Sequence, residues 1–287
     1  MKLTDLVSKF PKILIYGPPG SGKTGLCLTL GARCEYWDLD DNLEVGFGLN
    51  DNLKQQRLQV EVKQFLEPDP KKASAFAKIR AYSETVVQLC ARNQYPYDAI
   101  VVDSLTALAA ASEDNTMAAA GRIEQAPEIQ HWGKLLKDVE NFISNLRALP
   151  KVVFFVAHDM EAGPPTNLKT TVAVPGKKLP GRVTRMFNEI WYVGIKPAGG
   201  GKYEFYIQTA PTSSITCRSG RGLANATIFA SNTNGVPGTS VSLWEILNRI
   251  YKPSATPTPT PTPTTTSTPT TTPTEPAAET LTAPVTA

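Results

Sequence analysis

Apolar residues in this chain follow two alternating patterns between residues 11 and 252. Short apolar or alternating runs, which are typical of strands, lie at residues 13–16, 34–37, 58–62, 99–103, 152–156, 190–193 and 203–207. Apolar residues spaced three or four apart, which are typical of amphipathic helices, lie at residues 76–90 and 132–146, and a shorter run that we also interpret as helical lies at residues 26–30. Because strands and helices alternate, we predict an α/β fold with a mostly parallel central sheet flanked by helices.

Two of these strands are expected to pair differently from the rest. The runs at residues 190–193 and 203–207 are separated by a glycine turn at residues 199–201, which predicts an antiparallel hairpin at one edge of the sheet. The run at residues 99–103 is apolar on both faces, so we expect it near the centre of the sheet.

The composition changes at Pro253, where threonine and proline repeats begin. Such a segment cannot bury enough apolar surface to offset the entropy of ordering. We therefore predict a disordered tail at residues 253–287 and one folded domain at residues 1–252. A spacer, a partner-binding segment and nearly neutral sequence are all compatible with the tail.

Charge and apolar content limit the classes of function. The formal net charge is +3, and the tail contributes only Glu275 and Glu279, so the domain is mildly basic and a polyanionic partner is permitted but not required. No stretch approaches the roughly 18 apolar residues of a membrane span, and the amino terminus has no apolar signal core, which predicts a cytoplasmic protein without a membrane partner. The cysteines lack metal-site spacing and are expected to be buried free thiols: Cys27, Cys34, Cys90 and Cys217.

Residues 17–24 read Gly-Pro-Pro-Gly-Ser-Gly-Lys-Thr, which matches the phosphate-loop pattern G-x-x-x-x-G-K-[ST]. The pattern lies between a predicted strand and a predicted helix, where backbone N–H groups and the helix dipole point at an anion. Lys23 would contact the β- and γ-phosphates of ATP, and the Thr24 hydroxyl would ligate Mg²⁺. We therefore predict that ATP and Mg²⁺ bind through the pattern and the residue after it: Gly17, Pro18, Pro19, Gly20, Ser21, Gly22, Lys23, Thr24 and Gly25.

Asp103 ends the predicted central strand, which is the position of a Walker B carboxylate that faces Mg²⁺. We therefore assign Thr24 and Asp103 as the metal residues, and a role for Asp103 as a helix N-cap is compatible with this assignment. The residue after Asp103 is Ser104 instead of glutamate. The serine argues against a AAA+ motor, although the Gly-Pro-Pro-Gly sequence resembles the phosphate loop of AAA+ proteins.

A catalytic base must then come from elsewhere, and three carboxylates follow the second strand. We choose Asp40 as the residue that orients the attacking water. For the other two carboxylates, the alternatives to a catalytic role are a structural role for Asp38 and simple solvation for Asp41. His158 follows the strand at residues 152–156. We interpret it as a γ-phosphate sensor or as a neutral imidazole bonded to a core carbonyl, and both interpretations stay open.

Residues 161–185 are rich in glycine and proline, and we expect a long loop at the carboxyl edge of the sheet. Its cations suit the phosphate backbone of nucleic acid: Lys169, Lys177, Lys178, Arg182 and Arg185. Because the segment lacks aromatic residues for base stacking, a flexible lid is the alternative. Further along, Arg218 and Arg221 are interpreted either as fingers that reach the nucleotide of a neighbouring subunit or as surface residues of a turn.

These motifs in this order resemble the RecA-like ATPase core. More narrowly, the chain resembles the phage Sak4-type nucleotide-binding proteins of single-strand annealing and recombination, with an AAA_24-like domain. The resemblance rests on residues 17–24, 37–40, 97–105 and 156–158 and covers approximately residues 10–225. It implies an ATPase that acts on single-stranded DNA in the host cytoplasm. It also implies a homo-oligomer with shared ATP sites, and a single-strand DNA-binding protein as a further partner.

By this resemblance, Asp40 is the counterpart of the RecA-type catalytic glutamate, His158 is the sensor, and Arg218 contacts the neighbour's nucleotide. Two residues depart from the family pattern: aspartate is one methylene shorter than glutamate, and a histidine stands where RecA has glutamine. Three alternatives stay open. They are a AAA+-like protein-remodelling ATPase, a P-loop small-molecule kinase with residues 161–185 as its lid, and a nucleotide switch without hydrolysis.

Overall fold

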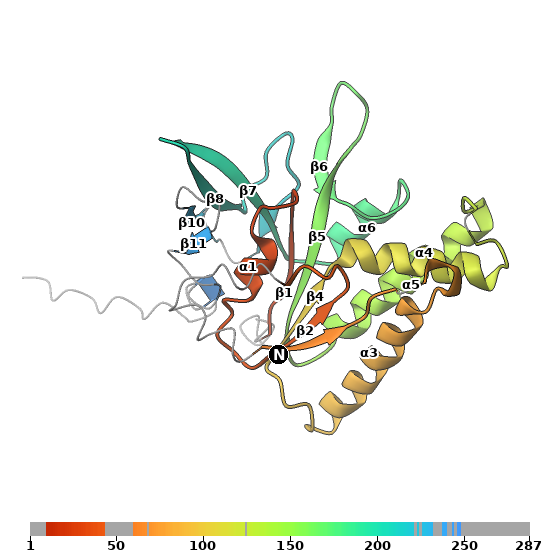
Figure 1. Cartoon of the computed structure of the whole chain (residues 1–287). Coiled ribbons are helices and arrows are strands. Elements are labelled where there is room, and N and C mark those ends of the chain that lie inside the picture. Colours follow the sequence, from red (N-terminus) through yellow and green to blue (C-terminus); the bar gives the residue numbers. More distant parts are fainter. Residues whose placement is uncertain are drawn as a thin grey trace, which may run out of the picture. The chain divides into compact units, whose positions relative to one another are not determined.

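The computed structural model describes residues 10–43, 60–67, 69–123, 125–220, 223, 226–231, 237–239, 243, 246 and 247. Within these residues, eleven strands form a sheet in the order β11-β10-β8-β7-β1-β5-β4-β2-β3, with β6 paired to β5 and β9 paired to β7 (Figure 1). The strands are β1 (Lys12–Gly17), β2 (Cys34–Asp38), β3 (Val60–Gln64), β4 (Ala99–Asp103), β5 (Val152–Ala162), β6 (Lys169–Val172), β7 (Glu189–Gly199), β8 (Lys202–Gln208), β9 (Arg218–Ser219), β10 (Ala226–Ser231) and β11 (Pro237–Thr239). The helices are α1 (Lys23–Cys27), the 3₁₀ helix η3 (Pro70–Lys72), α3 (Ala75–Ala91), α4 (Leu105–Ala119), α5 (Ile129–Arg147) and α6 (Leu179–Arg185).

The strands at the centre of the sheet are parallel, which confirms the predicted α/β fold. β7, β1, β5, β4, β2 and β3 lie side by side in this order and run in one direction. β7 and β8 form the predicted antiparallel hairpin, and β10 and β11 continue the sheet beyond it. β4 lies inside the parallel part, between β5 and β2, as its doubly apolar run predicts.

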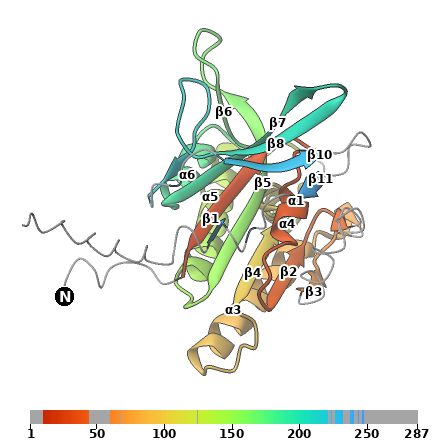
Figure 2. The same ribbon diagram turned by 90° about the vertical axis from the view of Figure 1, so that its left-hand side faces the viewer.

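Each face of the parallel strands packs against its own hydrophobic cluster. On β1, Leu14 and Tyr16 belong to a cluster with residues of α3, α4, α5 and α6, whereas Ile13 and Ile15 belong to a cluster with residues of α1. Figures 1 and 2 show α3, α4 and α5 on one face of the sheet and α1 on the other. Because both faces are covered, the strands are nearly continuous apolar runs. The four cysteines are buried and free, as predicted.

Three elements differ from the sequence-based expectation. The hydrophobic pattern does not predict α4, because its alanine-rich sequence has high helix propensity but little amphipathic contrast. The helix expected at residues 26–30 is shorter, since α1 ends at Cys27 and the Thr29 hydroxyl then donates to the carbonyl of Leu26. Residues 161–185 are not a loop throughout: they contain the end of β5, β6 and α6, and the β-branched residues of β6 favour a strand.

Some predictions lie outside the described residues. These are the first two residues of the strand expected at 58–62, Arg221, and the tail at residues 253–287. The division into a domain at residues 1–252 and a tail therefore stays a prediction. None of the helices in the described ranges is long and apolar enough to cross a membrane.

Candidate functional site

Residues of four neighbouring strands, β1, β5, β4 and β2, meet at the carboxyl edge of the parallel sheet. Gly17 at the end of β1 lies opposite His158 on β5, and Asp103 at the end of β4 lies opposite Asp38 at the end of β2. Because β5 runs between β1 and β4, His158 stands between the phosphate loop and Asp103. This is the edge at which open parallel sheets bind their ligands.

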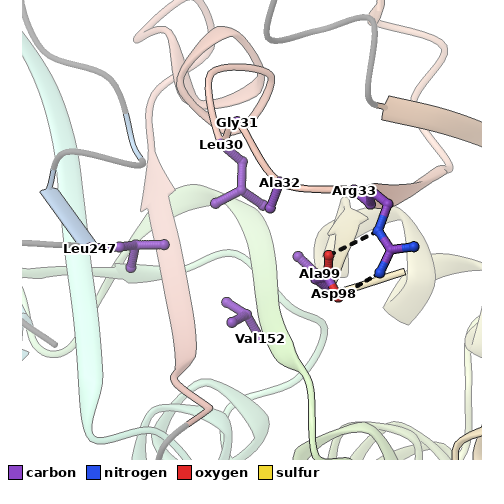
Figure 3. A pocket seen from close by; sticks show the side chains of 8 residues that line it. All are labelled: Leu30, Gly31, Ala32, Arg33, Asp98, Ala99, Val152 and Leu247. Atoms are coloured by element: carbon purple, nitrogen blue, oxygen red, sulfur yellow. Dashed lines mark hydrogen bonds and ion pairs between the residues drawn. The ribbon is translucent and has the colours of Figure 1, made fainter. Parts of the chain in front are cut away.

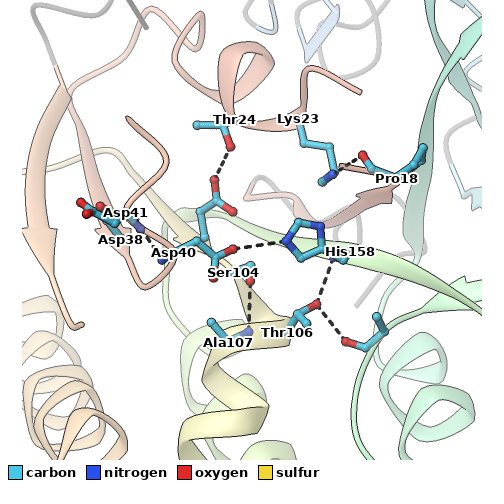
Figure 4. A network of polar contacts seen from close by, with 12 residues as sticks. Pro18, Lys23, Thr24, Asp38, Asp40, Asp41, Ser104, Thr106, Ala107 and His158 are labelled. Atoms are coloured by element: carbon cyan, nitrogen blue, oxygen red, sulfur yellow. Dashed lines mark hydrogen bonds and ion pairs between the residues drawn. The ribbon is translucent and has the colours of Figure 1, made fainter. Parts of the chain in front are cut away.

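A cavity of about 370 Å³ opens at this edge, and most of the residues predicted to bind the nucleotide and Mg²⁺ line it. Figure 4 shows the side chains of Lys23 and Thr24 from α1, Asp40 from the turn after β2, and His158 from β5 around this site. The lining residues are Pro19, Gly20, Gly22, Lys23, Thr24, Gly25, Asp40, Asn42, Asp103 and His158. Asn42 belongs to none of the predicted motifs.

The phosphate loop requires glycine at three positions. Gly20 and Gly22 have φ angles of 75° and 83°, in the left-handed region that glycine adopts without strain. A Cβ atom on Gly17 would overlap with the carbonyl oxygen of Val193 on β7. The loop is therefore shaped by its own turns and also packs closely against the neighbouring strand.

Gly17→Ala is expected to destabilise the protein by about 1–3 kcal/mol, the usual cost of overpacking, and to weaken ATP binding, because the methyl group must push the loop away from Val193. Thermal unfolding with and without ATP measures both effects. Gly181→Ala is the matched control, because Gly181 lies in α6 with open space around its Cβ position, and this change should be neutral or stabilising. Equal unfolding temperatures for the two variants would contradict the tight packing of Gly17.

Lys23 is a buried cation at the start of α1. Its Nζ donates to the carbonyl oxygens of Gly17 at 2.9 Å and Pro18 at 2.8 Å. Burial lowers the pKa of Lys23, and the carboxylate of Asp103 is the strongest opposing influence. A phosphate group in the cavity would give the ammonium group a charged partner in place of the two carbonyls.

Asp103 and Thr24 are hydrogen-bonded on the wall of the cavity. Thr24 Oγ1 donates to Asp103 Oδ2 at 2.7 Å, and the buried hydroxyl of Tyr36 donates to the same oxygen. Asp103 is only 4% exposed, and this burial raises its pKa while the bonds from Thr24 and Tyr36 oppose the rise. Burial also raises the pKa of Tyr36, so its hydroxyl stays protonated. A hydroxyl and a carboxylate side by side match the oxygen ligands that Mg²⁺ combines with phosphate and water, so the donor set fits this ion.

The three carboxylates at the end of β2 and in the turn after it have different surroundings. Asp38 is buried and accepts hydrogen bonds from the backbone N–H groups of Asp40 at 3.2 Å and Asp41 at 3.0 Å, so it stabilises the turn. Asp41 accepts a bond from the side chain of Gln64 at 3.2 Å. Of the three, Asp40 lines the cavity, with its side chain 15% exposed. This position fits the predicted base, while the catalytic role itself stays a prediction.

His158 faces the same carboxylate. Its Nε2 lies 3.5 Å from Asp40 Oδ2. Its Nδ1 is buried and has no hydrogen-bond partner among the described residues. The alternative of an imidazole bonded to a core carbonyl is therefore not seen in this part of the chain, and the arrangement favours a polar role at the cavity.

A family model for an AAA domain, AAA_24, matches residues 9–219, which is most of the chain. The chain belongs to this AAA domain family. No curated protein matches it. The chain is also similar to a solved structure of a prototypical ATPase from the type III secretion system of pathogenic bacteria, with 12% sequence identity and a TM-score of 0.43. The similarity covers 64% of this chain and 52% of that one, so this chain spans about half the length of that ATPase. The predicted P-loop nucleotide-binding family is confirmed, whereas the narrower Sak4-type assignment stays a prediction.

The predicted nucleic-acid cations of the AAA domain lie outside the lining of the cavity. All five are exposed, with one on β6 and the others on α6 and the turn before it: Lys169, Lys177, Lys178, Arg182 and Arg185. Arg182 also forms an ion pair with Glu140 of α5 at 3.1 Å. The cations thus belong to a strand, a helix and the short turn before that helix instead of a long loop.

Arg218, for which contact with a neighbour's nucleotide stays a prediction, is exposed on β9. Its Nε donates to the carbonyl oxygen of Phe187 at 2.9 Å, and its Nη2 donates to that of Thr184 at 2.8 Å. The guanidinium therefore binds the carboxyl end of α6 in its own AAA domain. A reach into the nucleotide of a neighbour would first have to break these bonds.

Thr106, in the first turn of α4, is a supporting residue that no sequence motif marks. Its Oγ1 accepts a bond from the backbone N–H of His158 at 3.0 Å and donates to the carbonyl oxygen of Ala173 at 2.8 Å. The backbone N–H of Ala173 in turn donates to the carbonyl oxygen of His158 at 2.8 Å. Thr106 thus ties the strand that carries His158 to the segment that leads into α6.

A second hollow of the AAA domain, of about 320 Å³, lies at the opposite, amino edge of the sheet (Figure 3). Its wall is mostly apolar, with Leu30, Val152 and Leu247 among the lining residues. Its charged lining residues, Arg33 and Asp98, form an ion pair with each other at 3.1 Å. No residue of the phosphate-binding motif lines it, so the nucleotide site belongs to the carboxyl edge.

Proposed function

We propose that this AAA domain protein is a Mg²⁺-dependent ATPase that acts on single-stranded DNA in phage-type recombination or annealing. The observation that carries the ATPase part is the convergence of Lys23, Thr24, Asp103, Asp40 and His158 on one cavity. This set combines a phosphate-binding cation, two oxygen ligands for Mg²⁺ and a separate carboxylate. Phosphoryl transfer to water needs these groups and little further covalent chemistry.

The position of each residue around the cavity indicates its proposed role in ATP hydrolysis. Backbone N–H groups of the phosphate loop and Lys23 bind the triphosphate, and Thr24 and Asp103 hold Mg²⁺, which supplies charge neutralisation on the phosphates. Asp40 orients the attacking water and takes up its proton. His158, 3.5 Å from Asp40, orients that carboxylate and responds to the presence of the γ-phosphate.

Exposed cations support the DNA part of the proposal. Lys177, Lys178 and Arg185 lie on α6 and the turn before it, where they are accessible to a phosphate backbone. The hydrogen bonds of Thr106 connect the same segment to His158. DNA bound on α6 and ATP bound in the cavity would thus act on one connected part of the domain.

The charges around the cavity support the proposal of an ATP site shared between two copies of the chain. Among the described lining residues, Lys23 is the cation and Asp40 and Asp103 are anions. The triphosphate adds further negative charge, and an additional cation is commonly supplied in cis or in trans during phosphoryl transfer. Because Arg218 is held by backbone carbonyls of its own subunit, a different cation of a second copy is the proposed source.

ATP turnover with and without single-stranded DNA tests the proposal. We expect Mg²⁺-dependent turnover that single-stranded DNA stimulates. DNA-independent turnover with phosphorylation of a small molecule would instead favour the kinase. Turnover stimulated only by a protein partner would favour a protein-remodelling ATPase, an alternative that is compatible with the AAA domain family.

The double variant Lys177→Ala/Lys178→Ala should weaken single-stranded DNA binding and lower the slope of log affinity against log salt by about 1.4, because two phosphate contacts are lost. ATP binding without DNA should not change, since neither lysine lines the cavity. Fluorescence anisotropy of a labelled oligonucleotide at several salt concentrations measures the slope. The matched control is Lys71→Ala/Lys72→Ala, two adjacent exposed lysines on η3. An equal loss in both double variants would mean that only net charge matters.

A further inference from the structure

Tyr36 lies under the nucleotide site without lining it. It is in the middle of β2, its side chain is 0% exposed, and it belongs to the hydrophobic cluster on the α1 face of the sheet. Its hydroxyl donates to Asp103 Oδ2 from the neighbouring strand. It is absent from the lining of the cavity, so it acts on a ligand only through Asp103.

The two donors to Asp103 differ in their position relative to the cavity. The Thr24 hydroxyl, 2.7 Å from Asp103 Oδ2, lies on the cavity wall, where a lone pair of its oxygen can ligate Mg²⁺ while its proton stays donated to Asp103. The hydroxyl of Tyr36 approaches Asp103 from the buried side and is outside the cavity lining. Both bonds end on Oδ2, which leaves Oδ1 as the oxygen available to a water of the Mg²⁺ shell.

We propose that Tyr36 is a positioning residue for Mg²⁺: from the buried side, its hydroxyl fixes the orientation of the Asp103 carboxylate, so that Oδ1 is available to the metal site. This inference rests on the Mg²⁺–ATP binding of the proposed function. Groups that orient a metal ligand from behind commonly change metal affinity about 10- to 100-fold when they are removed. Without the Tyr36 bond, the Asp103 carboxylate would be held by the Thr24 hydroxyl alone, so it could rotate and lose the orientation that presents Oδ1 to the metal site.

Tyr36→Phe removes one oxygen atom and keeps the ring, so it is the variant of choice. The Mg²⁺ concentration for half-maximal binding of a fluorescent ATP analogue should rise about tenfold or more. Binding of the analogue in EDTA should stay at the wild-type level, since the phosphate loop and Lys23 are untouched. The same titration with Mn²⁺ as the probe, followed by its paramagnetic signal, reads metal binding without any turnover.

Tyr95→Phe is the matched control. The Tyr95 hydroxyl is also buried and also donates to a carboxylate, that of Glu35, which is on β2 but outside the cavity lining. We expect Tyr95→Phe to change the unfolding temperature but to leave the Mg²⁺ requirement at the wild-type value. Equal shifts of the Mg²⁺ requirement in the two variants, or none in Tyr36→Phe, would overturn the inference.

Two further measurements distinguish a failure of the proposed function from a failure of the proposed role of Tyr36. Wild-type protein that binds no ATP analogue in the presence of Mg²⁺ would refute the proposed function, whereas wild-type binding with an unshifted Tyr36→Phe refutes only the role of Tyr36. If Tyr36→Phe does not fold, wild-type protein with ¹³C-labelled tyrosine Cζ decides. A Tyr36 signal that keeps its hydrogen-bonded shift on addition of Mg²⁺ and ATP supports the inference, and a change to the shift of a free phenol overturns it.

Discussion

Lys23→Ala should lower ATP turnover by about a hundredfold or more. Lys23 is the cation among the described lining residues of the cavity, and removing one charge-stabilising donor from a phosphoryl- or acyl-transfer site typically costs about 10²- to 10³-fold. Its Nζ already points into the loop, 2.9 Å from the Gly17 carbonyl, so it needs little movement to reach a phosphate. A coupled assay of phosphate release at saturating ATP and Mg²⁺ gives the rate.

Lys12→Ala is the matched control for this experiment. Lys12 lies at the opposite end of β1, is partly buried, and donates to the carbonyl oxygen of Leu149 at 2.9 Å. Burial lowers the pKa of Lys12 to about 8, so its environment resembles that of Lys23 without the nucleotide site. Turnover should survive in Lys12→Ala even if the unfolding temperature falls. Comparable losses of turnover would show that the Lys23 effect is one of folding.

Asp40→Asn should lower turnover by about 10²- to 10⁴-fold, the usual contribution of a general base, while ATP affinity stays near the wild-type value. The amide keeps the shape of the side chain but cannot take up the proton of the attacking water. Single-turnover hydrolysis together with binding of a fluorescent ATP analogue separates the two quantities. Asp41→Asn is the control, because Asp41 lies on the same turn and bonds to Gln64. Normal turnover in Asp40→Asn would move the base to another residue and leave a binding role for Asp40.

The site residues that could be predicted from the sequence are those fixed by local order along the chain. A strand that ends in a glycine-rich loop and a lysine places Lys23 and Thr24 without any distant contact. Asp103 follows from the same logic, since the carboxyl ends of parallel strands share one edge. Asp40 follows β2 as expected, whereas His158 lies within β5, which is longer than the run at residues 152–156, and the two side chains meet at this edge.

The contacts that could not be predicted all depend on partners far away in sequence. Tyr36 and Asp103 are 67 residues apart, and Thr106 and Ala173 are also 67 residues apart. No periodicity marks such pairs, because a buried tyrosine or a threonine in a first helical turn fits ordinary packing equally well. Arg218 also depends on distant partners: its position in the sequence suggested a contact with a neighbour's nucleotide, but its guanidinium donates to backbone carbonyls at the end of α6.

The fold shows the same division between local and distant information. α3 and α5 have clear apolar spacing and were expected, whereas α4 forms from alanine-rich sequence that is packed between α3, α5 and β5. The hairpin of β5 and β6 pairs residues such as Glu161 and Thr170 across a Gly- and Pro-rich turn. The glycine and proline residues of the segment favour a loop, whereas its β-branched residues at 170–172 and the pairing with β5 favour a strand.

Because Gly17 approaches Val193 closely, the base and the tip of the hairpin of β7 and β8 differ in how well they should tolerate an insertion. At its base, the Val193 carbonyl backs the phosphate loop, so inserting or deleting a residue there would shift the wall of the ATP site by one pleat. At its tip, residues 199–201 are exposed glycines in the left-handed region. The tip is therefore the place to insert a fluorophore or an affinity tag that leaves nucleotide binding intact.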